Sequence, residues 1–318
     1  MLAKTRIFFV TDVHGSDKCF RKFVNAGKFY NANVLINGGD IAAKVIVPFV
    51  KRSDGSYACK YAGEEYALKS KEKVDEMVKN VRDLGCYAYL VEPKDLEEIY
   101  SSKERQDALF KELMKESLTR WMRLAEERLR GTGIRCYISP GNDDPFEIDE
   151  VLNSSDYVIN PEEEVVELDG EHEMLTLGTA NRTPWKTPRE ADEGALREKI
   201  DKMASQVKAM KKAIFNFHVP PIDTALDKAA KLDENLRQVV SSGHIVMISA
   251  GSTAVRSSIE EYQPLMGLHG HIHESGGTAR IGRTMCFNPG SEYSSGRLAG
   301  FLGEIEGESI RSHQLTSG

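Results

Sequence analysis

The chain has 318 residues, enough for two domains of ordinary size or for one large α/β domain. Its composition, 40% hydrophobic and 29% charged residues, is that of a folded globular protein and excludes a disordered chain, a collagen-like chain and a small disulfide-stapled scaffold. The formal net charge of −7 disfavours a non-specific nucleic-acid binder, because that class carries a basic excess, although it leaves room for a local basic patch.

The cysteines and the N-terminal segment predict the cellular compartment of the protein. The five cysteines are widely spaced and form no C-x-x-C pair, so we expect reduced, packed thiols and neither a disulfide framework nor a cysteine zinc site. No run approaches the roughly 18 apolar residues of a membrane span. A cleaved presequence of about 15–30 residues would remove the polar cluster that begins at Asp12. We therefore expect a cytoplasmic protein without membrane contact.

A strand–helix–strand unit is predicted at the start of the chain. Residues 6–10 form a short apolar run, residues 16–26 carry apolar side chains at helical spacing, and residues 34–36 form a second apolar run. This order predicts a βαβ unit with parallel strands. Polar residues follow both strands, at the carboxyl ends where α/β sheets place their sites.

The stretch that follows Asp40 is about seventy residues longer than a βαβ unit of about 30 residues requires. Residues 45–50 and 57–61 predict a hairpin around Asp54-Gly55, and residues 64–84 and 103–130 predict helices that end at glycines. We therefore predict one domain over 1–318 with a hairpin-plus-helical insertion at about 45–131. The insertion is either a lid beside a site, or it covers the core or builds a dimer surface of a homo-oligomer.

The second half of the chain changes from alternating elements to strands. Residues 136–138 predict a strand, and the runs at 189–210 and 224–240 predict helices. From residue 264 onward, short strands dominate. Alternation at first and β-strands late predict a mixed α/β sandwich instead of a purely doubly wound sheet.

Five polar clusters follow strand-like runs. In chain order they are Asp12-x-His14, Gly39-Asp40, Gly141-Asn142-Asp143, His218 and Gly270-His271-Ile272-His273. Each cluster alone is a weak signal, because short polar patterns arise by chance and usually mark turns. Together they offer oxygen and imidazole ligands without thiolates, which suit Mn²⁺, Fe²⁺, Zn²⁺, Co²⁺ or Ni²⁺. Seven ligands are too many for one open tetrahedral site, but they suffice for two ions that share a carboxylate.

This ordered set resembles the motifs of the calcineurin-like metallophosphoesterase superfamily, D-x-H, G-D, G-N-[HD], H and G-H-x-H. The resemblance spans residues 5 to about 292. The run from His269 to Glu274, followed by Asn288-Pro-Gly-Ser291, is similar to the Icc-type prokaryotic phosphoesterases. The resemblance implies an αββα four-layer sandwich, in which two mixed sheets are flanked by helices and a dinuclear metal centre lies at one edge.

The resemblance also assigns roles to the clustered residues. It implies a first ion held by Asp12, His14 and His273, a second held by Asn142, His218 and His271, and Asp40 as the bridge between them. The implied reaction is metal-dependent hydrolysis of a small phosphoester, more specifically a phosphodiester, by a hydroxide that bridges the two ions and attacks phosphorus in line. Asn142 and Arg182 are the candidates for contact with substrate oxygens, although a solvated loop explains Arg182 equally well.

Asp143 departs from the family pattern. Its position commonly carries the histidine that is the usual candidate to protonate the leaving group. An aspartate beside two cations is expected to have a lowered pKa, which makes Asp143 a poor general acid. Either the leaving group needs little assistance, or another donor, such as His269 or a water molecule, supplies the proton.

The residues after Asp40 and the departure at Asp143 bear on the class of function. Asp40 is followed by Ile-Ala-Ala-Lys44, whereas the protein Ser/Thr phosphatases of this superfamily continue with x-V-D-R-G, so the sequence argues against a protein phosphatase. An alternative is a catalytically reduced scaffold with the same fold. The departure at Asp143 supports that alternative, and the complete set of seven ligands opposes it.

Overall fold

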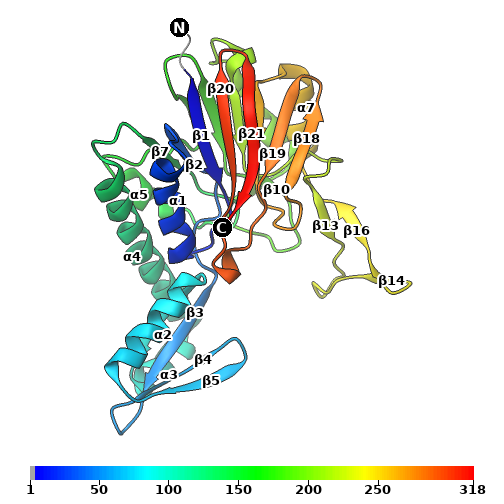
Figure 1. The fold of residues 1–318 in the computed structure, drawn as a ribbon. Coiled ribbons are helices and arrows are strands. Elements are labelled where there is room, and N and C mark those ends of the chain that lie inside the picture. Colours follow the sequence, from blue (N-terminus) through cyan, green and yellow to red (C-terminus); the bar gives the residue numbers. More distant parts are fainter. Residues whose placement is uncertain (1–3) are drawn as a thin grey trace.

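The structure, a computed structural model that describes residues 4–318, is built around two facing β-sheets (Figure 1). The first sheet has the strand order β21-β20-β1-β2-β7, in which β1, β2 and β7 run parallel. Its strands are β1 (Thr5–Val10), β2 (Val34–Asn37), β7 (Arg135–Ile138), β20 (Ala299–Glu306) and β21 (Ser309–Ser317). The predicted βαβ unit at the start of the chain is confirmed.

The second sheet has six strands in the order β18-β19-β17-β12-β9-β8. Its four central strands are parallel, and β8 and β18 pair antiparallel at the two edges. The strands are β8 (Val165–Glu167), β9 (Glu173–Leu177), β12 (Ile214–Phe217), β17 (Met266–Leu268), β18 (Gly277–Ile281) and β19 (Thr284–Asn288). Both sheets therefore combine parallel and antiparallel neighbours.

Side chains from both sheets form the central core. Phe9 and Ile36 from the first sheet pack in one buried cluster with Met174, Leu268 and Phe287 from the second. The outer face of the first sheet is covered by α1 (Asp17–Phe29), α4 (Lys103–Leu129) and α5 (Ile148–Asn153), and that of the second by α6 (Glu193–Ala204) and α7 (Thr253–Tyr262). The predicted αββα sandwich is confirmed.

Helix α1 shows how the local sequence produces this layer. Ser16 stands at the N-cap, where its hydroxyl accepts a hydrogen bond from the Cys19 amide. Phe20, Phe23 and Val24 follow at helical spacing and are buried against the sheet. None of the helices within residues 4–318 has the length and the apolar character that a membrane crossing requires. The five cysteines, all within these residues, are free, as predicted.

An additional sheet is inserted between β2 and β7. Its order is β5-β4-β3-β6, and it carries its own small core, which includes Val47, Phe49, Val81 and Ala88. The elements are β3 (Val45–Lys51), β4 (Tyr57–Tyr61), β5 (Glu64–Leu68), α2 (Lys71–Asp83), β6 (Cys86–Val91) and α3 (Pro93–Tyr100). We refer to residues 45–91 as the inserted sheet, which extends away from the sandwich in Figure 1.

The predicted hairpin is confirmed as β3 and β4, and the helix predicted over 103–130 is confirmed as α4. The prediction of a helix over 64–84 is wrong in its first part, because residues 64–68 form strand β5. Tyr66 and Leu68 alternate inward at a period of two, and the helix begins only after Ser70, which caps it. Helix α4 packs on the sandwich core through Met114, Leu118 and its neighbours, so much of the surplus chain covers the core.

A second peripheral element lies at the other sheet. The predicted helix over 224–240 is wrong: the chain forms β13 (Lys228–Ala230), β14 (Val240–Ser241), β15 (His244–Ile245) and β16 (Met247–Ser249), which project from the sandwich as an arm (Figure 1). The Asp227 carboxylate accepts hydrogen bonds from the amides of Asp223, Thr224 and Gly251, which closes the base of the arm. Most side chains along residues 231–248 are exposed, so a helix there would have no face to bury.

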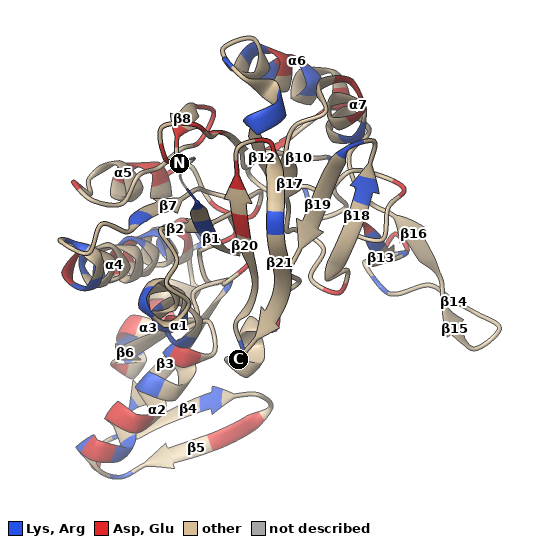
Figure 2. Cartoon of the chain, turned by 45° about the horizontal axis from the view of Figure 1, so that its top comes forward, with Lys and Arg blue, Asp and Glu red and all other residues tan. Residues whose placement is uncertain are grey.

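The remaining elements are short. A two-stranded sheet pairs β10 (Ala180–Asn181) with β11 (Glu190–Ala191), and single 3₁₀ turns lie at Met210–Lys212 and Tyr293–Ser295. Acidic and basic side chains are interspersed over the helices and the inserted sheet (Figure 2). The longer helices carry charges of both signs, whereas the short helix α5 carries only the acidic Asp149 and Glu150.

Candidate metal centre

The predicted ligands meet at the carboxyl ends of the parallel strands. Asp12 and His14 follow β1, Asp40 follows β2, Asn142 follows β7, His218 follows β12, and His271 and His273 follow β17. Four of these residues have backbones in the left-handed region, with φ of 53° at Asp12, 38° at His14, 53° at Asp40 and 66° at His271. Non-glycine residues rarely adopt this conformation, and strained backbone of this kind is frequent at functional sites.

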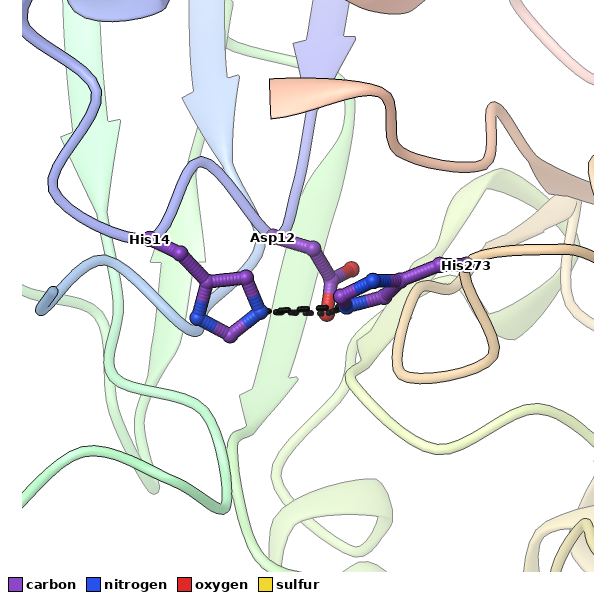
Figure 3. Close-up of side chains that lie close together, drawn as sticks. All are labelled: Asp12, His14 and His273. Atoms are coloured by element: carbon purple, nitrogen blue, oxygen red, sulfur yellow. Dashed lines mark hydrogen bonds and ion pairs between the residues drawn. The ribbon is translucent and has the colours of Figure 1, made fainter. Parts of the chain in front are cut away.

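The first group consists of Asp12, His14 and His273 (Figure 3). The Nε2 atoms of His14 and His273 lie 3.0 Å apart, and Asp12 Oδ1 lies 3.2 Å from His273 Nε2 and 3.9 Å from His14 Nε2. Asp12 and His14 are buried, whereas His273 is partly exposed. Two imidazole nitrogens and a carboxylate oxygen therefore point at one common position.

The second group lies directly beside the first. His218 Nε2 is 3.4 Å from Asp40 Oδ1 and 3.9 Å from Asp12 Oδ1, while Asp40 Oδ2 is 3.7 Å from His14 Nε2. Asp40 thus directs one oxygen toward each histidine. His271 Nδ1 faces Asn142 Oδ1 at 2.7 Å on the same side of the cluster. The structure brings all seven predicted ligands together.

The donor atoms fit a metal ion. Asp12 Oδ1 and His218 Nε2 are fully buried and have no hydrogen-bond partner, which is costly unless a cation satisfies them. Carboxylate oxygens and imidazole nitrogens are the ligands that borderline divalent ions prefer. The buried His/Asp groups are therefore consistent with a metal site.

Burial and the two carboxylates set the protonation of the histidines. Burial lowers the pKa of His14 to about 3 and that of His271 to about 4, so both rings are neutral near pH 7 and can offer a lone pair. Burial also lowers the pKa of His218, but the negative charges of Asp40 and Asp12 have a larger, opposite effect and raise this pKa to about 10. In the protein without a cation, His218 therefore carries a proton that a metal ion would displace.

Asp144 joins two of the ligand loops. Its buried carboxylate accepts hydrogen bonds from the amides of Ile41, Ala42 and Gly141, at 2.8–3.1 Å. Burial, with a contribution from the charge of Asp40, raises its pKa to about 7. No role for Asp144 was predicted from the sequence, although its place directly after Asn142-Asp143 was a signal. This residue fixes the loop after β2 against the loop after β7.

Asp143 pairs with a lysine that sequence reasoning did not single out. The Asp143 amide donates to Asp40 Oδ1 at 3.0 Å, and its carboxylate forms an ion pair with the Lys44 ammonium. We expected cations to lower the pKa of Asp143. Without them, the protein groups act the other way, because burial and the charge of Asp40 raise this pKa while Lys44 opposes the rise. Lys44 therefore compensates a carboxylate at the edge of the cluster.

Two candidates from the sequence do not line the cavity above this cluster. The ring of His269, the alternative proton donor, is buried, and its Nδ1 faces the Phe217 carbonyl oxygen at 2.8 Å. The side chain of Arg182, the candidate for contact with substrate, is exposed. Neither residue lines the cavity above the cluster. The structure thus gives neither side chain direct access to a ligand bound in that cavity.

A cavity of about 630 Å³ opens over the cluster. We call the polar side chains that line it at the cluster its floor and the apolar side chains that line it its wall. The floor includes Asp40, Asn142, Asp143, His271 and His273. The wall includes Phe110 from α4, Pro145, Trp185 from the loop between β10 and β11, and Ala229 and Leu232 from the arm. Segments far apart in the sequence therefore enclose one site.

Comparison with curated proteins finds relatives over about half of the chain. An uncharacterized protein of Methanocaldococcus jannaschii is 31% identical over 152 residues, which make up 47% of this chain and 61% of that protein. A UDP-2,3-diacylglucosamine hydrolase of Shigella dysenteriae is 27% identical over 156 residues, or 49% of this chain and 60% of the hydrolase. The chain thus spans about three fifths of the length of these relatives. No family model matches it.

Comparison with solved structures extends over nearly the whole chain. One structure has a TM-score of 0.57 at 15% identity, and that of TT1561 from Thermus thermophilus has a TM-score of 0.52 at 13% identity. Each match covers 99% of both chains. At such low identity these matches show a shared fold.

Proposed function

We propose that this chain, which has the calcineurin-like metallophosphoesterase fold, is a metal-dependent phosphoester hydrolase. The observation that carries the proposal is the buried cluster of Asp12, Asp40 and His218 beside His14 and His273. The orphaned atoms Asp12 Oδ1 and His218 Nε2 lie within it. A hydrolase among the relatives supports the same interpretation.

The ligand set supports a site for two divalent ions, with manganese as the first to test. Asp12, His14 and His273 would hold one ion, Asn142, His218 and His271 the other, and Asp40 has an oxygen for each. A pair of divalent ions supplies Lewis acidity, which lowers the pKa of a water molecule and offsets charge on the phosphoryl oxygens. Neutral His14 and His271 need not lose a proton to act as ligands.

The surroundings of the cluster favour a phosphodiester over a monoester. Near neutral pH a monoester carries close to two negative charges and a diester one. The charge of the Asp143 carboxylate does not decide between the two, because the Lys44 ammonium pairs with it. The cavity, however, has room for a second ester group beside a phosphoryl group. The predicted membership of the Icc-type branch agrees with a preference for phosphodiesters, and it stays a prediction.

The test is hydrolysis of bis(p-nitrophenyl) phosphate by the purified full chain with and without Mn²⁺. We expect turnover that requires the metal and is lost in Asp40→Ala. Asp75→Ala removes an exposed carboxylate of α2 and serves as the matched control, with unchanged turnover. A folded protein without metal-dependent turnover would contradict the proposal and favour the scaffold alternative.

A further inference from the structure

The cavity over the cluster is much larger than a phosphoryl group needs. Its 630 Å³ lies in the range of pockets that hold whole small molecules. The polar floor can bind the phosphoryl end of a ligand, and the apolar wall lines the rest of the cavity. The shape and chemistry of the cavity therefore carry information about the substrate beyond the reaction type.

Lys44 is the one lysine or arginine among the cavity-lining residues of the described chain. It follows Asp40 by four positions, so the same loop fixes both residues. Its side chain is 46% exposed and its ammonium is held by the Asp143 carboxylate at the edge of the cluster. An ammonium in this position is a point charge that a phosphoryl oxygen can reach.

Three elements that are far apart in the sequence contribute side chains to the apolar wall. Phe110 comes from α4, Trp185 from the loop between β10 and β11, and Leu232 from the arm. Trp185 is 60% exposed, although tryptophan is among the side chains that gain most from burial. An aromatic side chain that remains exposed at the wall of a cavity offers a flat face to a ligand.

We propose that the substrate is an organic phosphoester with a flat aromatic or heterocyclic ester group. Lys44 binds an oxygen of its phosphoryl group, and the ester group lies against the wall formed by Trp185, Phe110 and Leu232. This inference rests on the proposed function, because it assumes that the phosphoryl group lies at the metal cluster. Arg182, the sequence-based candidate, has no part in it, since Arg182 does not line the cavity.

Direct binding tests the inference without turnover. The probes are phenylphosphonate and methylphosphonate, which share a phosphoryl group and differ in the aromatic ring, titrated by calorimetry into the Mn²⁺-loaded full chain. We expect phenylphosphonate to bind more tightly to the unmodified protein. Trp185→Ala is expected to weaken phenylphosphonate about tenfold, in line with the energy of stacking on one aromatic ring, and to leave methylphosphonate unchanged. Phe29→Ala, an exposed phenylalanine outside this cavity, is the matched control.

Lys44→Met is expected to weaken both phosphonates to a similar degree, about tenfold, as the loss of one charge-assisted hydrogen bond implies. Lys51→Met, which removes an exposed lysine of β3 outside the cavity, is the matched control. The double variant Lys44→Met/Asp143→Asn removes the ion pair as a whole. If Lys44 binds the phosphoryl group, binding stays weak in the double variant. If Lys44 only neutralises Asp143, binding returns.

The outcomes separate this inference from the proposed function. Equal affinities for the two phosphonates, or an unchanged phenylphosphonate affinity in Trp185→Ala, would overturn the apolar subsite. Unchanged binding in Lys44→Met, or full recovery in the double variant, would overturn the role of Lys44. Each of these results is compatible with metal-dependent hydrolysis in the unmodified protein, whereas absent turnover would count against the proposed function itself.

Discussion

The Asp/His cluster and the inserted sheet touch each other, but different interactions hold each of them together. The cluster draws its residues from strand ends across the whole sandwich, and its loops are fixed by hydrogen bonds, left-handed backbone and buried charge. The inserted sheet is continuous in sequence and packs on itself around Phe49 and Val81. The loops of the cluster therefore depend on the entire fold. The inserted sheet, in contrast, can unfold locally while the sandwich stays intact.

The contacts between these two regions show how the inserted sheet supports the cluster. The Ser16 hydroxyl donates to the Asp83 carbonyl at 2.6 Å, and the Ala43 amide donates to the Tyr87 hydroxyl at 3.1 Å. Gly85 lies so close to the His14 backbone that a Cβ at this position would be 2.6 Å from the His14 carbonyl oxygen. The end of α2 and the start of β6 therefore brace the loops that carry His14 and Asp40.

The largest expected effect is at the cluster itself. Asp12 belongs to two of the three groups of possible ligands within the described residues, and its Oδ1 lies within 4 Å of His14, His218 and His273, so Asp12→Ala removes a central donor atom. Even substitutions that only support a metal ligand cost about 10–100-fold in affinity or activity, so we expect a greater loss here. Metal content measured by mass spectrometry after gel filtration checks it, with Asp107→Ala on the exposed face of α4 as control. Retention of metal by Asp12→Ala would show that the cluster is not the site.

The second prediction separates the two regions by stability. Phe49 and Phe9 are fully buried phenylalanines, one in the inserted sheet and one in the sandwich core. Truncation of either to alanine costs about 3–5 kcal/mol. Hydrogen exchange is expected to accelerate only over 45–91 in Phe49→Ala, but over both main sheets in Phe9→Ala. If Phe49→Ala loosens the sandwich to the same extent, the inserted sheet is not an independent unit.

The third prediction concerns the contact between the regions. Gly85 has φ of 87° and no room for a Cβ, whereas Gly55 has φ of 81° and open space around it. Alanine at either position costs about 1–3 kcal/mol for the backbone conformation. Only the added Cβ in Gly85→Ala also clashes with the His14 backbone. We therefore expect this variant to bind Mn²⁺ about tenfold more weakly, which is the usual effect of changing a residue that supports a metal ligand. Equal Mn²⁺ affinity of the two variants in a calorimetric titration would contradict the bracing role.

The smallest effect is a pH dependence. Glu162 is partly buried, its carboxylate accepts a hydrogen bond from the Gly178 amide, and the loss of solvent around the carboxylate raises its pKa from 4.5 to about 8. Between these values the folded protein binds more protons than the unfolded chain, so this group lowers stability as pH rises. Glu162→Gln removes that loss, so its stability relative to the unmodified protein is expected to grow steadily from pH 5 toward pH 8. Thermal unfolding at both ends of the range checks it, and a difference that does not change with pH would contradict it.

The sequence predicts which side chains meet in the cluster, because each follows an apolar run that becomes a strand end. Asp12, Asp40 and His218 need no knowledge of distant contacts, since parallel strands bring their carboxyl ends to one edge. The ion pair of Lys44 with Asp143 is different. It joins residues about one hundred positions apart, and it depends on the path of two loops that no periodicity encodes.

The wrong helix over 224–240 has a related cause. The run contains helix-forming residues, yet the arm buries almost none of them, and helix propensity alone is weak without a face to pack. Residues 64–68 were also expected to be helical. There, Tyr66 and Leu68 pack into the core of the inserted sheet, which favours a strand. Local composition decided the prediction in both places, and tertiary packing decided the structure.

The central claim is that the Asp/His cluster binds two divalent ions that enable phosphoester hydrolysis. The most direct measurement counts metal ions per chain in the purified, Mn²⁺-loaded protein and records bis(p-nitrophenyl) phosphate turnover in the same sample as Mn²⁺ is added to the metal-free chain. We predict that turnover rises with occupancy and levels off at two ions per chain. A folded chain that binds no Mn²⁺, or that binds it without any turnover, would contradict the claim.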